Sequence, residues 1–218
     1  MKVKVCGLRE PENVAEICGL DPAYLGFVFH PASPRFAGQP ALGEWLHAND
    51  DVLRGKELFG VFVNAEVDYL LNTVHDFRLD WVQLHGDESP GYCRELKLLW
   101  SVNTLRKAGI AKAFSITPDF DFNRTNPYVG SCGLFVFDTG GQGGHGGTGK
   151  KWDWSKLRAY TGPVPFLLSG GIGPEDAQAI RKLDHPQLRG VDVNSRFETE
   201  PGIKDARRLG LFLRTLNA

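Results

Sequence analysis

Residues that could transfer protons stand at the ends of two apolar segments. The run "VKVCG" leads to Cys6 and Gly7, and "GLFVFD" ends with Asp138. Thiolates and carboxyl groups serve as general bases and general acids in enzymes. A free thiol ionises only near about pH 8.5, so Cys6 could act as a base at neutral pH only in electropositive surroundings. From the residues alone the alternatives stay open: Cys6 could be a small buried core residue, and Asp138 could cap a helix.

A glycine-rich segment follows Asp138 directly, "FDTGGQGGHGGTGKKWDW" over residues 137–154. Its second half spells G-x-x-x-x-G-K and ends at Lys150, which resembles a nucleotide-binding P-loop. A P-loop needs Ser or Thr after this lysine, because that hydroxyl binds Mg²⁺. Lys151 stands there instead, and the segment lies past the midpoint of the chain. The pattern therefore favours a glycine-rich loop with a different function.

Apolar, strand-like segments recur along the chain and alternate with segments of helical character. The expected strands are residues 3–7, 24–29, 57–63, 81–86, 110–116, 133–138, 164–170 and 188–194. The expected helices are residues 11–20, 41–50, 66–77, 89–99, 154–160, 174–183 and 203–216. Near-continuous apolar strands are typical of parallel sheets covered by helices. Eight such units in a chain of this length predict an α/β fold, a (β/α)8 TIM barrel. Residues 99–105 are an alternative for the fifth strand.

A barrel of this kind places its site at the carboxyl ends of the strands and in the loops that follow them. The loops after the seventh and eighth strands usually hold a phosphate, helped by the N-terminus of a short helix. There "SGGIGPED" supplies Gly170 and Gly171, and "NSRFE" supplies Asn194, Ser195 and Arg196. These two loops predict phosphate binding, although the glycines could also serve only as tight turns.

The composition indicates an ordinary globular chain, with 42% hydrophobic and 23% charged residues, and we expect one domain over residues 1–218. The net charge of -1 gives no sign of nucleic acid or an acidic membrane as partner. Cys6, Cys18, Cys93 and Cys132 are scattered, which fits free thiols in a reducing compartment. There is no apolar region of a signal peptide, and no apolar run approaches the about 20 residues of a membrane helix. We expect a soluble cytoplasmic protein.

Several stretches together resemble the phosphoribosylanthranilate isomerase family of tryptophan biosynthesis. They are "KVCGLREPENV", "GFVFHPASPRF", "VQLHGDE", the glycine-rich segment, "PFLLSGGIGPEDA" and "GVDVNSRFETEPGIKD". They span nearly the whole chain in the family's order. The resemblance implies an Amadori rearrangement of N-(5-phosphoribosyl)anthranilate to 1-(2-carboxyphenylamino)-1-deoxyribulose 5-phosphate. It also implies that residues 110–116 are the fifth strand, since family members carry a Lys-Ala pair there.

The resemblance further implies roles for individual residues. Cys6 matches the general base, and Asp138 matches the general acid, whose pKa burial would have to raise for proton donation near neutral pH. Arg35 matches the residue that meets the anthranilate carboxylate, which suits a planar guanidinium. Asp192 matches a residue near the substrate's amine or sugar hydroxyls. His85 would line the substrate pocket, or only hold a loop through hydrogen bonds.

The loop after the sixth strand would then be a mobile flap that closes over substrate. The chain departs from the family after the last strand, where many members read S-S-G-V-E and this chain reads "NSRFE". Arg196 thus replaces a glycine that often lies at the phosphate. It could add a charge to the phosphate site, or it could turn outward.

Three alternatives to this family differ in the residues that they need. The dual-substrate isomerase shared by the histidine and tryptophan pathways has an aspartate where this chain has Cys6. Indoleglycerol-phosphate synthase relies on a lysine and on glutamates, and the matching glutamates are missing. A non-catalytic barrel that binds a phosphorylated metabolite would need neither Cys6 nor Asp138.

We expect neither a metal nor a redox cofactor, because the reaction needs none. His30, His75, His85 and His145 show no tight pairing of the kind that metal sites use. The expected partner is the small-molecule substrate phosphoribosylanthranilate, bound by a monomer or a homodimer.

Overall fold

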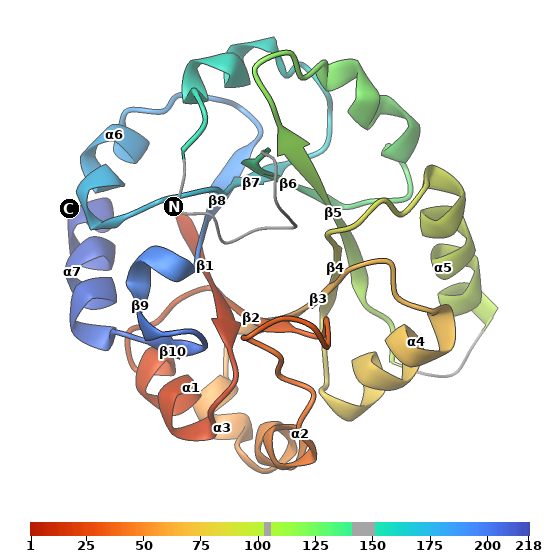
Figure 1. The fold of residues 1–218 in the computed structure, drawn as a ribbon, viewed down its shortest axis with the longest axis vertical. Coiled ribbons are helices and arrows are strands. Elements are labelled where there is room, and N and C mark those ends of the chain that lie inside the picture. The colour runs from red at the N-terminus through yellow and green to blue at the C-terminus, as the bar shows by residue number, and fades with distance from the viewer. Residues whose placement is uncertain (103–105, 141–150) are drawn as a thin grey trace.

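A closed barrel of parallel strands forms the centre of the protein, and helices surround it (Figure 1). The computed structural model describes residues 1–102, 106–140 and 151–218. The barrel strands are β1 (Lys2–Leu8), β2 (Tyr24–Val28), β3 (Glu57–Phe62), β4 (Trp81–Leu84), β5 (Gly109–Ile116), β6 (Leu134–Thr139), β7 (Phe166–Leu168) and β8 (Leu188–Val193). Neighbours in sequence pair in parallel, and β8 pairs with β1 to close the ring. The predicted fold class is therefore confirmed, whereas the extent of one domain over residues 1–218 stays a prediction.

The fifth strand is β5, as the family resemblance implied. The alternative over residues 99–105 is wrong, because helix α5 (Pro90–Val102) runs through it and buries Trp100. Residues 103–105 lie outside the described residues.

The segments between the strands differ in detail from the expected helices. The α-helices are α1 (Pro11–Cys18), α2 (Pro40–Ala48), α3 (Asp50–Leu53), α4 (Val67–Asp76), α5, α6 (Ala177–Arg181) and α7 (Ala206–Asn217). Short 3-10 helices are η1 (Phe122–Tyr128), η2 (Trp154–Ala159), η3 (Pro174–Asp176) and η4 (Ser195–Phe197). The helix expected at residues 41–50 is thus split between α2 and α3, and the one at residues 174–183 between η3 and α6. No helix within the described ranges is long and apolar enough to cross a membrane.

The last helix starts later than predicted. Asp205 caps α7, because its carboxylate accepts a hydrogen bond from the backbone N–H of Arg208. The preceding residues, expected to be helical, instead form strand β10 (Ile203–Lys204), which pairs with β9 (Glu198–Glu200). This hairpin lies beside β1, between α1 and α7 (Figure 1).

Alternation along the strands divides the core into two layers. Successive side chains of a strand point to opposite faces. In β6, Phe135 and Phe137 belong to the larger cluster packed against the helices, whereas Leu134 and Val136 belong to a separate cluster inside the barrel. Asp138 is two residues beyond Val136 and therefore also faces the interior. The inner face changes in this way from apolar to polar toward the carboxyl ends of the strands.

The outer layer should carry much of the stability. Phe166 is fully buried, and its ring centroid lies 4.8 Å from that of Phe137 and 5.6 Å from that of Tyr160. Phe166→Ala is expected to lower the free energy of unfolding by about 3–5 kcal/mol, because it leaves a cavity in this cluster. Urea denaturation measures the change. Leu211→Ala, at a side chain that is 53% exposed on α7, should change it by less than about 0.5 kcal/mol. Equal effects of the two substitutions would contradict this description of the core.

Candidate active site

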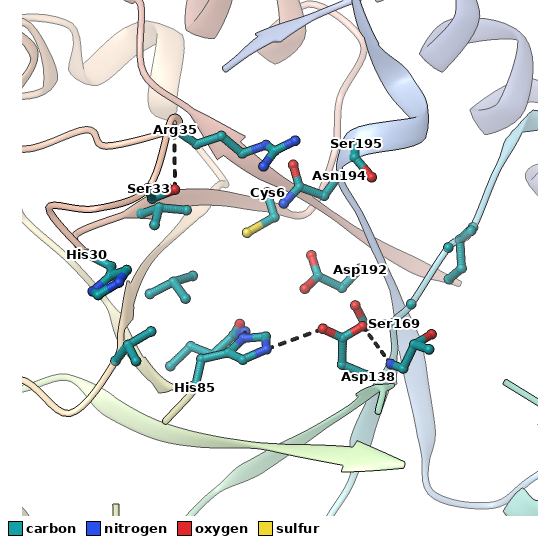
Figure 2. A pocket seen from close by; sticks show the side chains of 18 of the residues that line it. Cys6, His30, Ser33, Arg35, His85, Asp138, Ser169, Asp192, Asn194 and Ser195 are labelled. Atoms are coloured by element: carbon teal, nitrogen blue, oxygen red, sulfur yellow. Dashed lines mark hydrogen bonds and ion pairs between the residues drawn. The ribbon is translucent and has the colours of Figure 1, made fainter. Parts of the chain in front are cut away.

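A single pocket at the carboxyl ends of the strands brings together the residues that the sequence singled out. These are Cys6, Arg35, His85, Asp138, Gly170, Gly171, Asp192, Asn194, Ser195 and Arg196. In Figure 2, Cys6 and Arg35 lie on one side of the pocket, His85 and Asp138 lie on the other, and Asp192 lies between them. The structure thus places a thiol and a carboxyl around one space, while the role of each residue stays a prediction.

Cys6 lies among buried charges. Burial raises the pKa of the Cys6 thiol, and the ammonium groups of Lys4 and Lys204 offset part of this rise. The carboxylate of Asp192 also raises this pKa, so positive charges that favour a thiolate are present without lowering the pKa below its ordinary value. They come from two lysines that the sequence did not identify as site residues. Gly26 on β2 leaves room for this arrangement, since a Cβ there would lie 3.0 Å from both Cys6 Sγ and Lys4 Cε.

The closure of the barrel brings Lys4 to Asp192. The two residues are register partners on β1 and β8, and Lys4 Nζ lies 3.0 Å from Asp192 Oδ2 in a fully buried ion pair. Burial nevertheless raises the pKa of Asp192 above its ordinary value. Its second oxygen, Oδ1, is buried and has no hydrogen-bond partner among the described residues. A buried acceptor without a donor is costly, so this atom is available to a hydroxyl or amine of a ligand.

Asp138 differs from the sequence-based expectation in its ionisation. Burial alone would raise the pKa of the Asp138 carboxyl, but hydrogen bonding to His85 and the backbone N–H of Thr139 lowers it below its usual value. His85 Nε2 lies 3.2 Å from Asp138 Oδ2, and Thr139 N lies 2.8 Å from Oδ1. The expected upward shift of the pKa is therefore wrong for the ligand-free protein, because donors to a carboxylate favour its charged form.

Arg35 is held by the carboxylate of Glu198, which no sequence pattern singled out. Its Nε and Nη2 donate to the two oxygens of Glu198 at 2.8 and 2.7 Å. Lys204 Nζ lies 2.7 Å from Glu198 Oε1 and 2.7 Å from Asn194 Oδ1. Residues 203–216 have the pattern of one helix, which gives no sign of a site residue at Lys204, yet Lys204 lies on β10 with its side chain fully buried. The contacts among the described residues leave the Nη1 group of Arg35 for a ligand.

The loops after β7 and β8 meet at the predicted phosphate site, and Lys151 from the segment after β6 reaches them. Gly170 and Gly171 follow β7 with φ of 97° and 63°, and Ser195 opens η4 after β8. Arg196 neither turns fully outward nor stays free, because its Nη2 lies 2.8 Å from Glu175 Oε1. Lys151 Nζ binds the same oxygen at 3.0 Å. Asp176 Oδ1 also lies 2.7 Å from Lys151 Nζ, so two cations stand beside this site, held by the carboxylates of Glu175 and Asp176.

Two other sequence-based expectations concern this end of the barrel. The mobile flap expected in the glycine-rich segment falls on residues 141–150, which lie outside the described residues. Asp153, rather than Asp138, caps the following helix, as its carboxylate accepts from the backbone N–H of Ser155. Within the described ranges, no group of three or more His, Cys, Asp or Glu side chains is placed to hold a metal ion.

The fold and the pocket define a (β/α)8-barrel protein with its polar site at the carboxyl ends of the strands. The family model of N-(5'-phosphoribosyl)anthranilate (PRA) isomerase matches residues 3–215. An N-(5'-phosphoribosyl)anthranilate isomerase from Parabacteroides distasonis is 42% identical over 218 residues, which cover 99% of this chain and 93% of that protein. One from Phocaeicola vulgatus is 38% identical over 216 residues, covering 99% and 98%.

Solved structures of phosphoribosylanthranilate isomerases are also similar to this chain. The crystal structure of phosphoribosyl anthranilate isomerase from Thermotoga maritima has a TM-score of 0.82 at 29% identity, covering 100% of this chain and 98% of that one. Another, at TM-score 0.79, 27% identity and the same coverage, is in complex with reduced 1-(o-carboxyphenylamino)-1-deoxyribulose 5-phosphate. The chain belongs to the phosphoribosylanthranilate isomerase family, the aldose–ketose isomerases of tryptophan biosynthesis.

The turn after β7 offers a test of the site's geometry. A Cβ at Gly170 would lie 2.1 Å from Thr139 Oγ1 and 3.0 Å from Asp138 Oδ1. Gly170→Ala is therefore expected to displace Asp138 and to lower kcat/KM at least about ten-fold, or about 1.4 kcal/mol. Gly55→Ala is the matched control, since Gly55 also has a positive φ of 78° but nothing within 4 Å of its Cβ position. The positive φ alone should cost both variants about 1–2 kcal/mol of stability, so equal activity in both would contradict this geometry.

Proposed function

We propose that Cys6 and Asp138 carry out the isomerisation of N-(5'-phosphoribosyl)anthranilate, Cys6 as general base and Asp138 as general acid. The observation that supports this most is the position of the two groups. They reach one pocket from β1 and β6, strands that are not neighbours in the barrel. A sugar phosphate bound between them would have an acid and a base on different sides.

The chemistry needs two proton transfers around the sugar. Asp138 in its protonated form would give a proton to the furanose ring oxygen, and the C1'–oxygen bond would open to a Schiff base. Cys6 as thiolate would then take the proton from C2', leaving an enolamine that relaxes to the ketone. No proton is gained or lost overall: the proton from Asp138 stays on the former ring oxygen, Cys6 holds the proton from C2', and the enolamine moves its O2' proton to C1' as the ketone forms. General acid–base catalysis of this kind typically contributes about 10²–10⁴-fold per group.

The remaining pocket residues would hold the substrate in place. Arg35 would bind the anthranilate carboxylate through its Nη1 group, and Glu198 would keep the guanidinium oriented. Asp192 would accept a hydrogen bond from the substrate's amine or a sugar hydroxyl, which the unpartnered Oδ1 supports. The phosphate would bind at the backbone of Gly170, Gly171, Asn194 and Ser195, with Arg196 adding a positive charge as it exchanges Glu175 for phosphate.

We also propose a cytoplasmic location, in keeping with a biosynthetic enzyme of small molecules. The four cysteines of the chain are all free thiols, which suits a reducing compartment. The choice between monomer and homodimer stays a prediction.

Turnover tests the reaction and both roles together. Freshly generated N-(5'-phosphoribosyl)anthranilate would be supplied, and the loss of its anthranilate-type fluorescence would be followed at steady state. The wild type should turn it over, whereas Cys6→Ala and Asp138→Asn should each lower kcat by at least about 10²-fold, because each removes a proton-transfer group.

Cys18→Ala is the control for the loss of a buried thiol. Cys18 is buried at the end of α1 and does not line the pocket, so kcat should stay within about two-fold. A folded wild type without turnover would contradict the proposed reaction. Normal turnover in either site variant would contradict that residue's role.

The pH dependence of kcat/KM follows from the directions of two pKa values. Burial raises the pKa of Cys6, while the donors around Asp138 hold its pKa low despite burial. At neutral pH the resting pair is therefore thiol and carboxylate. The reactive pair, a thiolate and a carboxylic acid, holds the same total number of protons as the resting pair. The fraction of the reactive pair therefore does not depend on pH between the two pKa values. We expect kcat/KM to stay constant within about two-fold from about pH 6 to 8, and a ten-fold change over this range would contradict the assignment.

A further inference from the structure

A buried lysine ties the two sides of the pocket together. Lys4 is 0% exposed, and its Nζ lies 2.7 Å from Gln83 Oε1 and 3.0 Å from Asp192 Oδ2. An ammonium group has only donors and no acceptor. Whatever faces Lys4 must therefore be an acceptor, and for Gln83 this leaves only the carbonyl oxygen of the side-chain amide.

The orientation of Gln83 determines the protonation of His85. With Oε1 toward Lys4, the NH₂ group of Gln83 faces His85 Nδ1, at 2.9 Å. An amide nitrogen only donates, so Nδ1 must accept and carry no proton. The neutral ring then has its proton on Nε2, which lies 3.2 Å from Asp138 Oδ2. All hydrogen bonds in this row point the same way, from Lys4 through Gln83 and His85 to Asp138.

We propose that Lys4 and Gln83 are positioning residues of the isomerase, which hold His85 as the neutral Nε2–H tautomer and so aim a fixed donor at Asp138. The proposal rests on the proposed role of Asp138. It also assigns His85 a specific role, namely to hold the Asp138 carboxyl in place rather than only to line the pocket.

This row excludes one alternative for the acid. A cationic His85 would carry a proton on Nδ1, where it would meet the NH₂ group of Gln83 donor to donor. Such a pair loses a buried hydrogen bond and is unfavourable. The proton for the ring oxygen is thus expected to leave from Asp138 rather than from an imidazolium. The charged groups that face this pair are Asp192 and, beyond it, Lys4.

The protonation of His85 can be read directly by ¹⁵N NMR of uniformly labelled protein. Protonated and unprotonated imidazole nitrogens have well-separated shifts, so each tautomer has its own signature. In the wild type, His85 should show a protonated Nε2 and an unprotonated Nδ1. His85→Phe assigns the signals. A protonated Nδ1 in the wild type would overturn the proposal without touching the proposed reaction, which wild-type turnover tests separately.

His185 serves as an internal reference for these spectra. Its Nδ1 accepts from the backbone N–H of Gln187 at 3.1 Å, and its Nε2 faces the carbonyl oxygen of Tyr160 at 3.0 Å. Backbone groups therefore fix the same tautomer there. Substitutions at Gln83 should leave the His185 signals unchanged.

Two substitutions of Gln83 test this row of hydrogen bonds. Gln83→Glu offers only acceptors, so His85 Nδ1 should gain a proton, and kcat should fall at least about ten-fold with a smaller change in KM. Gln83→Leu removes the donor, so both tautomers of His85 should appear, and kcat should also fall. Gln178→Glu, at an exposed residue of α6, makes the same chemical change away from the pocket and should keep wild-type kcat and spectra.

Lys4→Met tests the first member of the row. Without the ammonium group, the amide of Gln83 is free to turn over, and His85 should again show mixed tautomers. If this variant does not fold, because Asp192 is left unpaired, the two Gln83 variants still decide. A single wild-type tautomer in a folded Gln83→Glu or Gln83→Leu protein, with unchanged kcat, would overturn the proposal.

Discussion

The buried charge of Lys4 is the constraint on which the rest of the pocket depends. An ammonium group without water must be paired and fully hydrogen-bonded, and removing one partner of a buried pair typically costs about 3–5 kcal/mol. Asp192 supplies the counter-charge across the seam where β8 closes on β1, and Gln83 supplies a second acceptor from β4. The interactions that join β8 to β1 therefore also arrange the polar site of the barrel.

The layered interior explains how a stable barrel can carry such a site. The inner cluster of Tyr24, Phe59, Leu134 and other apolar residues fills the lower part of the barrel. The ring of Phe59 lies 5.3 Å from Lys4 Nζ, where its face also favours a cation. Because the polar residues lie above this packed layer, their rotamers are restricted before any substrate arrives. Such pre-organisation is what acid–base catalysis requires of its groups.

The barrel and the residues that line the pocket could be predicted from the sequence, because both follow from the succession of strands and from the residues at the strand ends. A residue such as Asp138 that ends a buried strand must lie at the carboxyl rim once the strands are parallel. The interactions among these residues could not be predicted in the same way. Lys4 looked like any residue inside a strand, since its link to Asp192 spans most of the chain and needs the β1–β8 register. The pKa of Asp138 was expected to rise because burial can be inferred from sequence, whereas the donor from His85 requires distances.

The most direct test of the account is a crystal structure of this protein with reduced 1-(o-carboxyphenylamino)-1-deoxyribulose 5-phosphate, the ligand of a related structure. The account predicts the phosphate at the backbone of Gly171 and Ser195 and the carboxylate at Arg35. The sugar carbons should then lie between Cys6 Sγ and the Asp138 carboxyl, which should approach from different sides. A ligand bound outside this pocket, or one with Cys6 and Asp138 on the same side of the sugar, would contradict it.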